Sequence, residues 1–175
     1  MPVIGMEPAL KPASLLPGDG YVVVMATHMT LTQPKFLRLM ERYGQNALPV
    51  PCPGLMECVE AGVFSGPRVE GLLDRLLASV RGMPVKAVVL GCTHYPIIRK
   101  NIMRLYPSLK IVNPSYEIIA RIKQILENED LLAEENDREN VFYASDLSEN
   151  FVNMIQKILE TEKSDLILKF KNLDL

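Results

Sequence analysis

Two short, valine-rich runs constrain the fold of this chain more than any other feature. They are YVVVMA at Tyr21–Ala26 and VKAVVL at Val85–Leu90. Each run is short and rich in β-branched side chains, which predicts a strand that is buried on both faces. After each run come a polar loop, a proline and then apolar residues at helical spacing. Strands separated by helices in this way predict an α/β fold with mostly parallel sheets flanked by helices.

The rest of the chain continues this alternation. Further strands are expected at Leu109–Val112 and Val141–Ala144, and the opening MPVIG also has the pattern of a strand. A last apolar run, LILKF, occupies Leu166–Phe170, and the acidic stretch Glu127–Asn140 is expected to be a helix end followed by a loop. Apolar spacing, prolines at helix starts and glycines at helix ends predict helices at 34–44, 55–61, 69–80, 96–105, 114–126 and 147–159.

The composition fits a folded domain and excludes several classes of partner. Hydrophobic residues make up 48% of the 175 residues and charged residues 23%, so the chain can bury a sizeable core. A net charge of −2 argues against a nucleic-acid or anionic-membrane surface, since both need clustered Lys and Arg. The longest apolar run is too short to cross a bilayer, and the first residues lack the pattern of a secretory signal.

The cysteines indicate reduced thiols. Cys52, Cys58 and Cys92 are odd in number and form no CxxC pair, which argues against a disulfide framework and favours a cytoplasmic protein. Their spacing, together with His94, matches no usual zinc site, so no metal is expected. Neither GxGxxG, GxxxxGK[ST] nor GxSxG occurs, which argues against nucleotide cofactors and a serine hydrolase.

Two polar loops follow the valine-rich runs, ATHMT after the first and GCTHYP after the second. In parallel sheets, ligands bind beyond the carboxyl ends of the strands, where these loops are expected. Cys92 precedes a helix start, which stabilises a thiolate, and His94 could supply a proton or a positive charge. A small buried hydrophobe is the structural alternative for Cys92. The hydroxyls of Thr27 and Thr30 could hold a carboxylate or simply belong to a turn.

These residues resemble the glutamate racemases, cofactor-independent enzymes that supply D-glutamate to peptidoglycan. VVLGCTHYPII at Val88–Ile98 is similar to the segment that carries the family's second catalytic cysteine. In the family's order and spacing, Met1–Ala13 resembles PVIGxxEPA, Val22–Phe36 resembles GTxxTxxSxxY and Pro51–Gly62 resembles CPxxxxxxExG. His94, Tyr95 and Pro96 favour glutamate over aspartate as the substrate. Ala26 and Gln33 replace the family's usual Gly and Ser.

The resemblance implies a role for each matching residue. Cys92 matches the thiol that removes the α-proton of L-glutamate and returns a proton in the reverse direction. His94 matches the histidine that assists this thiol, and Glu60 matches a nearby carboxylate. Thr93, Thr27 and Thr30 match residues around the substrate. Such a racemase needs an acid and a base on opposite faces of one carbon, and thiols suit both roles when their environment tunes them.

The family's first catalytic cysteine, with its CNT motif, and a catalytic aspartate would lie upstream of the segment that Met1 begins. We therefore expect an N-terminally truncated racemase chain that lacks the first catalytic cysteine. The family's two-lobed fold implies one complete lobe at 14–112. Residues 1–13 and 113–175 would then be part of the second lobe.

Two other functions remain open on the sequence alone. One is an inactive amino-acid-binding remnant, and the other is a related thiol racemase that acts on aspartate. For the main hypothesis, the expected partner is the small molecule glutamate, without a cofactor, nucleic acid or membrane, and the family resemblance also allows a homodimer.

Overall fold

The computed structural model describes residues 3–133, 140–145, 147–161 and 168–172. Its strands are β1 (Tyr21–Ala26), β2 (Ala47–Pro51), β3 (Val85–Leu90), β4 (Lys110–Val112), β5 (Asn140–Ala144) and β6 (Leu168–Asn172). Its α-helices are α1 (Leu10–Ser14), α2 (His28–Thr32), α3 (Pro34–Tyr43), α4 (Leu55–Glu60), α5 (Pro67–Leu76), α6 (Arg99–Leu105), α7 (Ser115–Asn128) and α8 (Glu149–Thr161). Two 3₁₀ turns, η1 (Ala78–Val80) and η2 (Tyr95–Ile98), complete the described elements.

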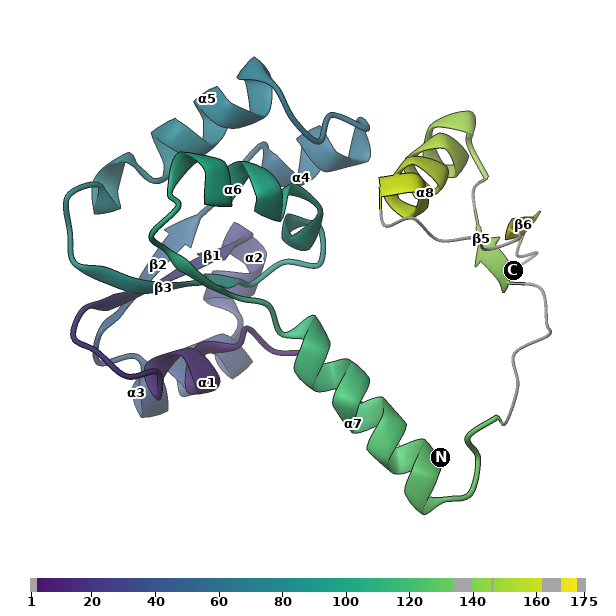
Figure 1. The fold of residues 1–175 in the computed structure, drawn as a ribbon, viewed down its shortest axis with the longest axis horizontal. Helices are drawn as coiled ribbons and strands as arrows, with labels where there is room; N and C mark the ends of the chain where they lie inside the picture. The colour runs from purple at the N-terminus through teal and green to yellow at the C-terminus, as the bar shows by residue number, and fades with distance from the viewer. Residues whose placement is uncertain (1–2, 134–139, 146, 162–167, 173–175) are drawn as a thin grey trace.

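A four-stranded parallel sheet forms the centre of the molecule, with the strand order β2-β1-β3-β4 (Figure 1). β5 and β6 pair in parallel as a second, two-stranded sheet. The prediction of an α/β fold with mostly parallel sheets flanked by helices is therefore confirmed. β1 and β3 also have the predicted bounds.

Helices cover both faces of the four-stranded sheet because its central strands are apolar on both sides. Val22 and Val24 of β1 pack in one core cluster, which includes residues of α1 and α3. Val23 and Met25 pack in the other cluster, with residues of α4, α5 and α6. Figure 1 shows these two groups of helices on opposite sides of the sheet. Both faces of the central strands are thus excluded from water, as a valine-rich run predicts.

β2 is an element that the sequence pattern did not predict. Its sequence, ALPVP, contains Pro49 and Pro51, which cannot donate backbone hydrogen bonds. β2 lies at the edge of the sheet and pairs only with β1, which is where strands tolerate proline. Because an edge strand tolerates proline, β2 lacks the valine-rich run that indicates the central strands.

Some expected boundaries are wrong. Residues 3–5 of the opening MPVIG form no strand, and Val3 is 91% exposed, because no strand pairs with this segment in the described part of the chain; residues 1–2 lie outside it. The predicted loop after Ala26 contains helix α2, which Thr27 caps. The helices expected at 69–80 and 96–105 are divided into α5 with η1 and η2 with α6, since the chain tightens into 3₁₀ turns near helix ends.

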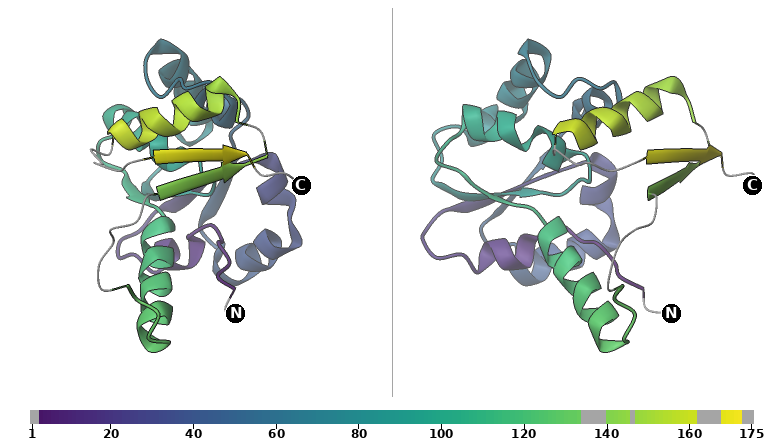
Figure 2. Two further views of the ribbon diagram at one scale, coloured as in Figure 1. Left: turned by 90° about the vertical axis from the view of Figure 1, so that its right-hand side faces the viewer. Right: turned by 45° about the vertical axis from the view of Figure 1, so that its right-hand side comes forward.

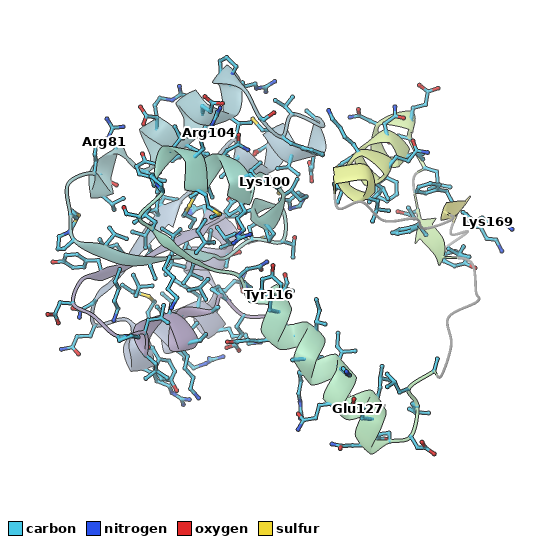
Figure 3. All side chains as sticks on the ribbon, in the orientation of Figure 1. Arg81, Lys100, Arg104, Tyr116, Glu127 and Lys169 are labelled. Carbon is cyan, nitrogen blue, oxygen red and sulfur yellow. The ribbon has the colours of Figure 1, made fainter. Side chains whose placement is uncertain are left out.

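The C-terminal part begins with α7, which leads away from the four-stranded sheet (Figure 1). Tyr116 is exposed on this helix (Figure 3), and Ile119 is exposed as well. β5, α8 and β6 follow, and the rings of Phe142 and Phe170 stack across the two strands with centroids 5.7 Å apart. Figure 2 shows α8 beside this small sheet. Part of the predicted loop, 134–139, and the start of the last apolar run, 166–167, lie outside the described residues.

The proposed division into lobes stays a prediction. The structure places Leu10 and Ala13 of α1 in the core of the four-stranded sheet. None of the described helices is long and apolar enough to cross a membrane.

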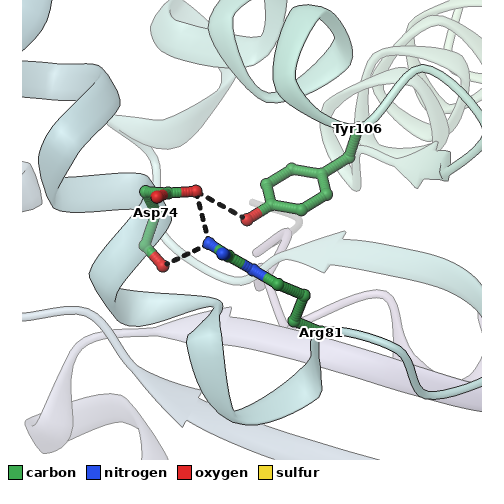
Figure 4. Close-up of polar contacts among 3 residues, drawn as sticks. All are labelled: Asp74, Arg81 and Tyr106. Carbon is green, nitrogen blue, oxygen red and sulfur yellow. Dashed lines mark hydrogen bonds and ion pairs between the residues drawn. The ribbon is translucent and has the colours of Figure 1, made fainter.

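An ionic cluster fastens the helices at the edge where β3 begins (Figure 4). Arg81 donates to Oδ1 of Asp74 at 2.6 Å, and Tyr106 donates to the same oxygen at 3.5 Å. The cluster joins the end of α5 to the end of α6. It therefore supports the end of the sheet at which β3 begins, and the GCTHYP loop lies at the other end of β3.

Candidate active site

The candidate site lies where β1 and β3 end side by side. The N–H of Gly91 donates to the carbonyl oxygen of Met25 at 2.7 Å, which draws the loop after β3 against the end of β1. A Cβ at Gly91 would lie 2.8 Å from that oxygen and 3.0 Å from Cβ of Ala26. Glycine is therefore needed for this close approach, and the approach places Cys92 beside the loop that follows β1.

Cys92, His94 and Glu60, the three predicted catalytic residues, form a line of contacts. Sγ of Cys92 lies 3.6 Å from Nδ1 of His94, and Nε2 of the same ring lies 3.3 Å from Oε1 of Glu60. Oγ1 of Thr93 lies 3.4 Å from Nδ1 of His94. The imidazole thus stands between a thiol and a carboxylate, which is the arrangement of a nucleophile, a base and an orienting group.

The line of contacts can move a proton between sulfur and nitrogen. A carboxylate at Nε2 favours the tautomer that carries its proton on Nε2, so Nδ1 can accept a proton from the thiol of Cys92 or a hydrogen bond from the hydroxyl of Thr93. Cys92 is partly exposed, the His94 side chain is 25% exposed and the Glu60 side chain 53%. A small molecule can therefore reach the sulfur while His94 stays between its two partners.

Thr27 and Thr30 lie at the end of β1, at the same edge of the sheet. Oγ1 of Thr27 accepts a hydrogen bond from the N–H of Thr30 at 3.2 Å, and the two hydroxyl oxygens lie 2.9 Å apart. Thr27 is the N-cap of α2, a role that threonine commonly fills. These contacts are the turn chemistry that the sequence left open, and a role toward substrate stays a prediction.

Cys52 and Cys58 are buried, in contrast to Cys92. Sγ of Cys52 donates to the carbonyl oxygen of Val50 at 3.3 Å, and burial raises the pKa of this thiol to about 12. The hydroxyl of Tyr95 donates to the carbonyl oxygen of Cys52 at 3.3 Å, so the Cys52 loop is fastened to the turn that follows Cys92. Burial raises the pKa of the Tyr95 phenol as well. Burial and these contacts therefore favour a protonated Cys52 with a structural role.

No group of three or more His, Cys, Asp or Glu side chains is arranged as a metal site among the described residues.

Tyr95, which the sequence motif includes as a residue that favours glutamate, is fully buried below the site. Two supporting residues, Asn101 and Lys157, were not identified from the sequence. Asn101 of α6 is buried with its Nδ2 donating to the carbonyl oxygen of Phe64 at 2.6 Å. Nζ of Lys157 donates to the carbonyl oxygen of Gly62 at 2.7 Å. Asn101 carried a signal, because it is a polar residue three positions after Ile98 on the apolar face of its helix. No local sequence pattern indicated Lys157, because its partner Gly62 lies 95 positions away in the chain.

Comparisons with known proteins agree with the sequence motifs. The glutamate racemase of Clostridium perfringens strain 13 is 38% identical over 172 residues, which is 97% of this chain and 64% of that protein. The glutamate racemase of Clostridium kluyveri strain ATCC 8527 is 44% identical over 128 residues, or 72% of this chain and 50% of that protein. No protein-family model matches the chain.

Solved structures show the same fold. Escherichia coli glutamate racemase in complex with L-glutamate and an activator, UDP-MurNAc-Ala, matches with a TM-score of 0.79 and 24% identity, over 98% of this chain and 65% of that chain. Francisella tularensis glutamate racemase in complex with D-glutamate matches with a TM-score of 0.77 and 23% identity, over 94% of this chain and 60% of that chain. The chain is therefore a homologue of the glutamate racemases, a family of isomerases, and spans less than two thirds of the length of these relatives.

Proposed function

We propose that this chain carries the Cys92 half of a cofactor-independent site that interconverts L- and D-glutamate. The observation that carries the proposal is the line of contacts from Cys92 through His94 to Glu60 at the carboxyl edge of a parallel sheet. Glutamate is the proposed substrate because the relatives above 35% identity are named glutamate racemases, and the two solved homologues hold L- and D-glutamate.

The proposed reaction begins with Cys92 as a thiolate. Its sulfur takes the α-proton of L-glutamate, and the electron pair of the broken C–H bond stays on the α-carbon, delocalised into the carboxylate. A second acid then protonates the opposite face and gives D-glutamate. In the reverse direction Cys92 is the acid. His94 accepts and returns the thiol proton, and Glu60 keeps its ring oriented.

Thr93, Thr27 and Thr30 are proposed to surround the substrate. Their hydroxyls and the neighbouring backbone amides are donors that suit the carboxylates of glutamate. The hydroxyls of Thr27 and Thr30 form a hydrogen bond with each other, so binding of glutamate would reorient at least one of them.

In this proposal the other two thiols of the chain do not supply the second acid, because Cys52 and Cys58 are both buried. The proposal therefore assigns the opposite-face acid to the part of the racemase length that this chain does not match. A cytoplasmic location belongs to the same proposal, because Cys92 must stay a free thiol.

A second candidate function is amino-acid binding without racemisation, which the single accessible thiol favours. An experiment in D₂O separates the two candidates. The chain is incubated with L-glutamate, α-deuterium is followed by NMR and D-glutamate by chiral chromatography. We expect Cys92-dependent deuterium exchange into L-glutamate with little D-glutamate, because inversion needs an acid on the other face.

Two controls complete this test. Cys92→Ala should abolish exchange, and L-aspartate should exchange more slowly than L-glutamate. Bound glutamate without any exchange would favour the binding function. Efficient D-glutamate formation that Cys92→Ala abolishes would mean that this chain, or a second copy, supplies both acids.

A further inference from the structure

The helix that carries Glu60 is short and depends on how it ends. α4 has six residues, and helices of this length gain little from their own hydrogen bonds. Gly62 closes the helix with a φ of +68°, its N–H donating to Val59 O at 2.9 Å and the N–H of Val63 to Cys58 O at 2.9 Å. The direction of the Glu60 side chain therefore depends on the turn formed by residues 61–63.

Lys157 of α8 holds this turn from outside the four-stranded sheet. Its Nζ donates to the carbonyl oxygen of Gly62 at 2.7 Å and lies 5.2 Å from the ring centroid of Phe64. The Gly62 carbonyl lies just past the C-terminal end of α4, where the partial negative charge of the helix end favours an ammonium group. The aromatic face of Phe64 adds a second favourable contact with the same charge.

The inner side of the same segment is held by Asn101. Its Nδ2 donates to the carbonyl oxygen of Phe64 at 2.6 Å. Asn101 lies on α6, which follows the Cys92 loop in the chain. Residues 62–64 thus bind α6 through Asn101 and α8 through Lys157.

The packing of α8 against this region leaves space. A cavity of about 260 Å³ lies between Ile158 of α8 and the residues Pro96 and Ile97 of η2. Apolar packing therefore does not hold α8 tightly against this region. Among the described residues, the hydrogen bond of Lys157 joins α8 directly to the end of α4.

We propose that Lys157 is a positioning residue for the candidate site. By holding the carbonyl of Gly62 it fixes the end of α4 and keeps the carboxylate of Glu60 within 3.3 Å of His94 Nε2. Without this contact Glu60, already half-exposed, turns toward water, and His94 loses the group that orients it. The inference rests on the proposed function, because it gives α8 control over the proton acceptor of Cys92.

A double-mutant cycle on Cys92 alkylation tests this inference without glutamate, so it stands or fails independently of racemisation. The full chain reacts with iodoacetamide at neutral pH, and mass spectrometry gives the rate at Cys92. Lys157→Met should slow this rate about threefold to tenfold in the natural chain and leave it unchanged in the Glu60→Gln background. Lys157→Arg should keep most of the rate.

Lys123→Met is the matched control, since Lys123 is an exposed lysine of α7 that pairs with Glu127 at 3.7 Å. It should leave the alkylation rate unchanged. Hydrogen exchange at the Val63 amide gives a second measurement on the same variants, and Lys157→Met should accelerate it. Equal slowing by Lys157→Met in both backgrounds would reveal a direct charge effect and overturn the proposal. An unchanged rate or an unchanged Val63 exchange would overturn it too.

Discussion

Nδ1 of His94 lies 3.6 Å from Sγ of Cys92, and the two residues are only two positions apart in the chain. The turn between β3 and η2 produces this contact, with the N–H of Tyr95 donating to the carbonyl oxygen of Cys92 at 3.2 Å. Tyr95 is buried, so the turn is anchored in the core while Cys92 and His94 stay accessible. A rigid scaffold thus presents two reactive groups at the surface.

Cys92 should be the most reactive of the three thiols. It is partly exposed beside an imidazole, whereas Cys52 and Cys58 are buried and burial raises the pKa of Cys52. Because the thiolate is the nucleophile, limiting iodoacetamide at neutral pH should label Cys92 first. Peptide mapping measures this directly, and preferential labelling of Cys52 or Cys58 would contradict the prediction.

Gly91→Ala should destabilise the protein by about 1–3 kcal/mol, because the new Cβ would overlap the Met25 carbonyl oxygen and force the backbone apart. The same change should slow Cys92 alkylation, since the loop would move from the end of β1. Urea unfolding measures the first effect. Gly71→Ala inside α5 is the control, where the nearest atom lies 3.8 Å away, and it should stabilise by about 0.5–1 kcal/mol. Equal stabilities of the two variants would refute this account.

Asn101→Leu should lower the free energy of unfolding by about 1–3 kcal/mol. The change keeps the volume but removes the donor to the carbonyl oxygen of Phe64 from a residue that is 7% exposed. Thermal and urea unfolding would measure the loss. Asn113→Leu offers a comparison at a turn, where the side chain accepts a hydrogen bond from the Ser115 N–H, and it should lower the free energy of unfolding by less. A larger loss at Asn113 would argue that the Asn101 contact contributes little.

The sequence predicted the central strands well because burial on both faces leaves a clear pattern. β1 is apolar throughout, and β3 is apolar apart from Lys86. β2 carries two prolines and a single buried residue, Val50, so its position depends on pairing with β1. Because such an edge strand is determined by its pairing in the folded protein, local sequence patterns do not predict it.

The candidate site was only partly predictable for a similar reason. Position after a strand indicated Cys92, and the family resemblance indicated Glu60, which taken alone is an ordinary acid at a helix end. Its contact with His94 joins residues 34 positions apart through the packing of α4 near η2. Lys157 is further still from Gly62, and no residue pattern in α8 marks it. Contacts between residues this far apart in the chain could be identified only once the fold was known.

Stability at alkaline pH should depend on Cys52. Burial raises the pKa of this thiol to about 12 in the folded chain, against 9.0 for an unfolded cysteine. Between these values the unfolded chain has released the proton and the folded chain has kept it. The unfolded state then binds fewer protons, so the free energy of unfolding falls as pH rises, by about 1.4 kcal/mol per unit at most. Below about pH 8 both states are protonated and the stabilising effect is fully present.

Cys52→Ala removes this titration and supplies the test. Urea unfolding of both chains at pH 8 and pH 10.5 gives the difference in free energy between them at each pH, in which the titrations of tyrosines and lysines cancel. Relative to Cys52→Ala, the natural chain should lose about 2 kcal/mol between the two pH values. A difference that does not change with pH would mean that water reaches the thiol in the folded state. The buried contact of Sγ with the Val50 carbonyl would then not hold in solution, and Cys52 would become a second candidate for an acid-base thiol.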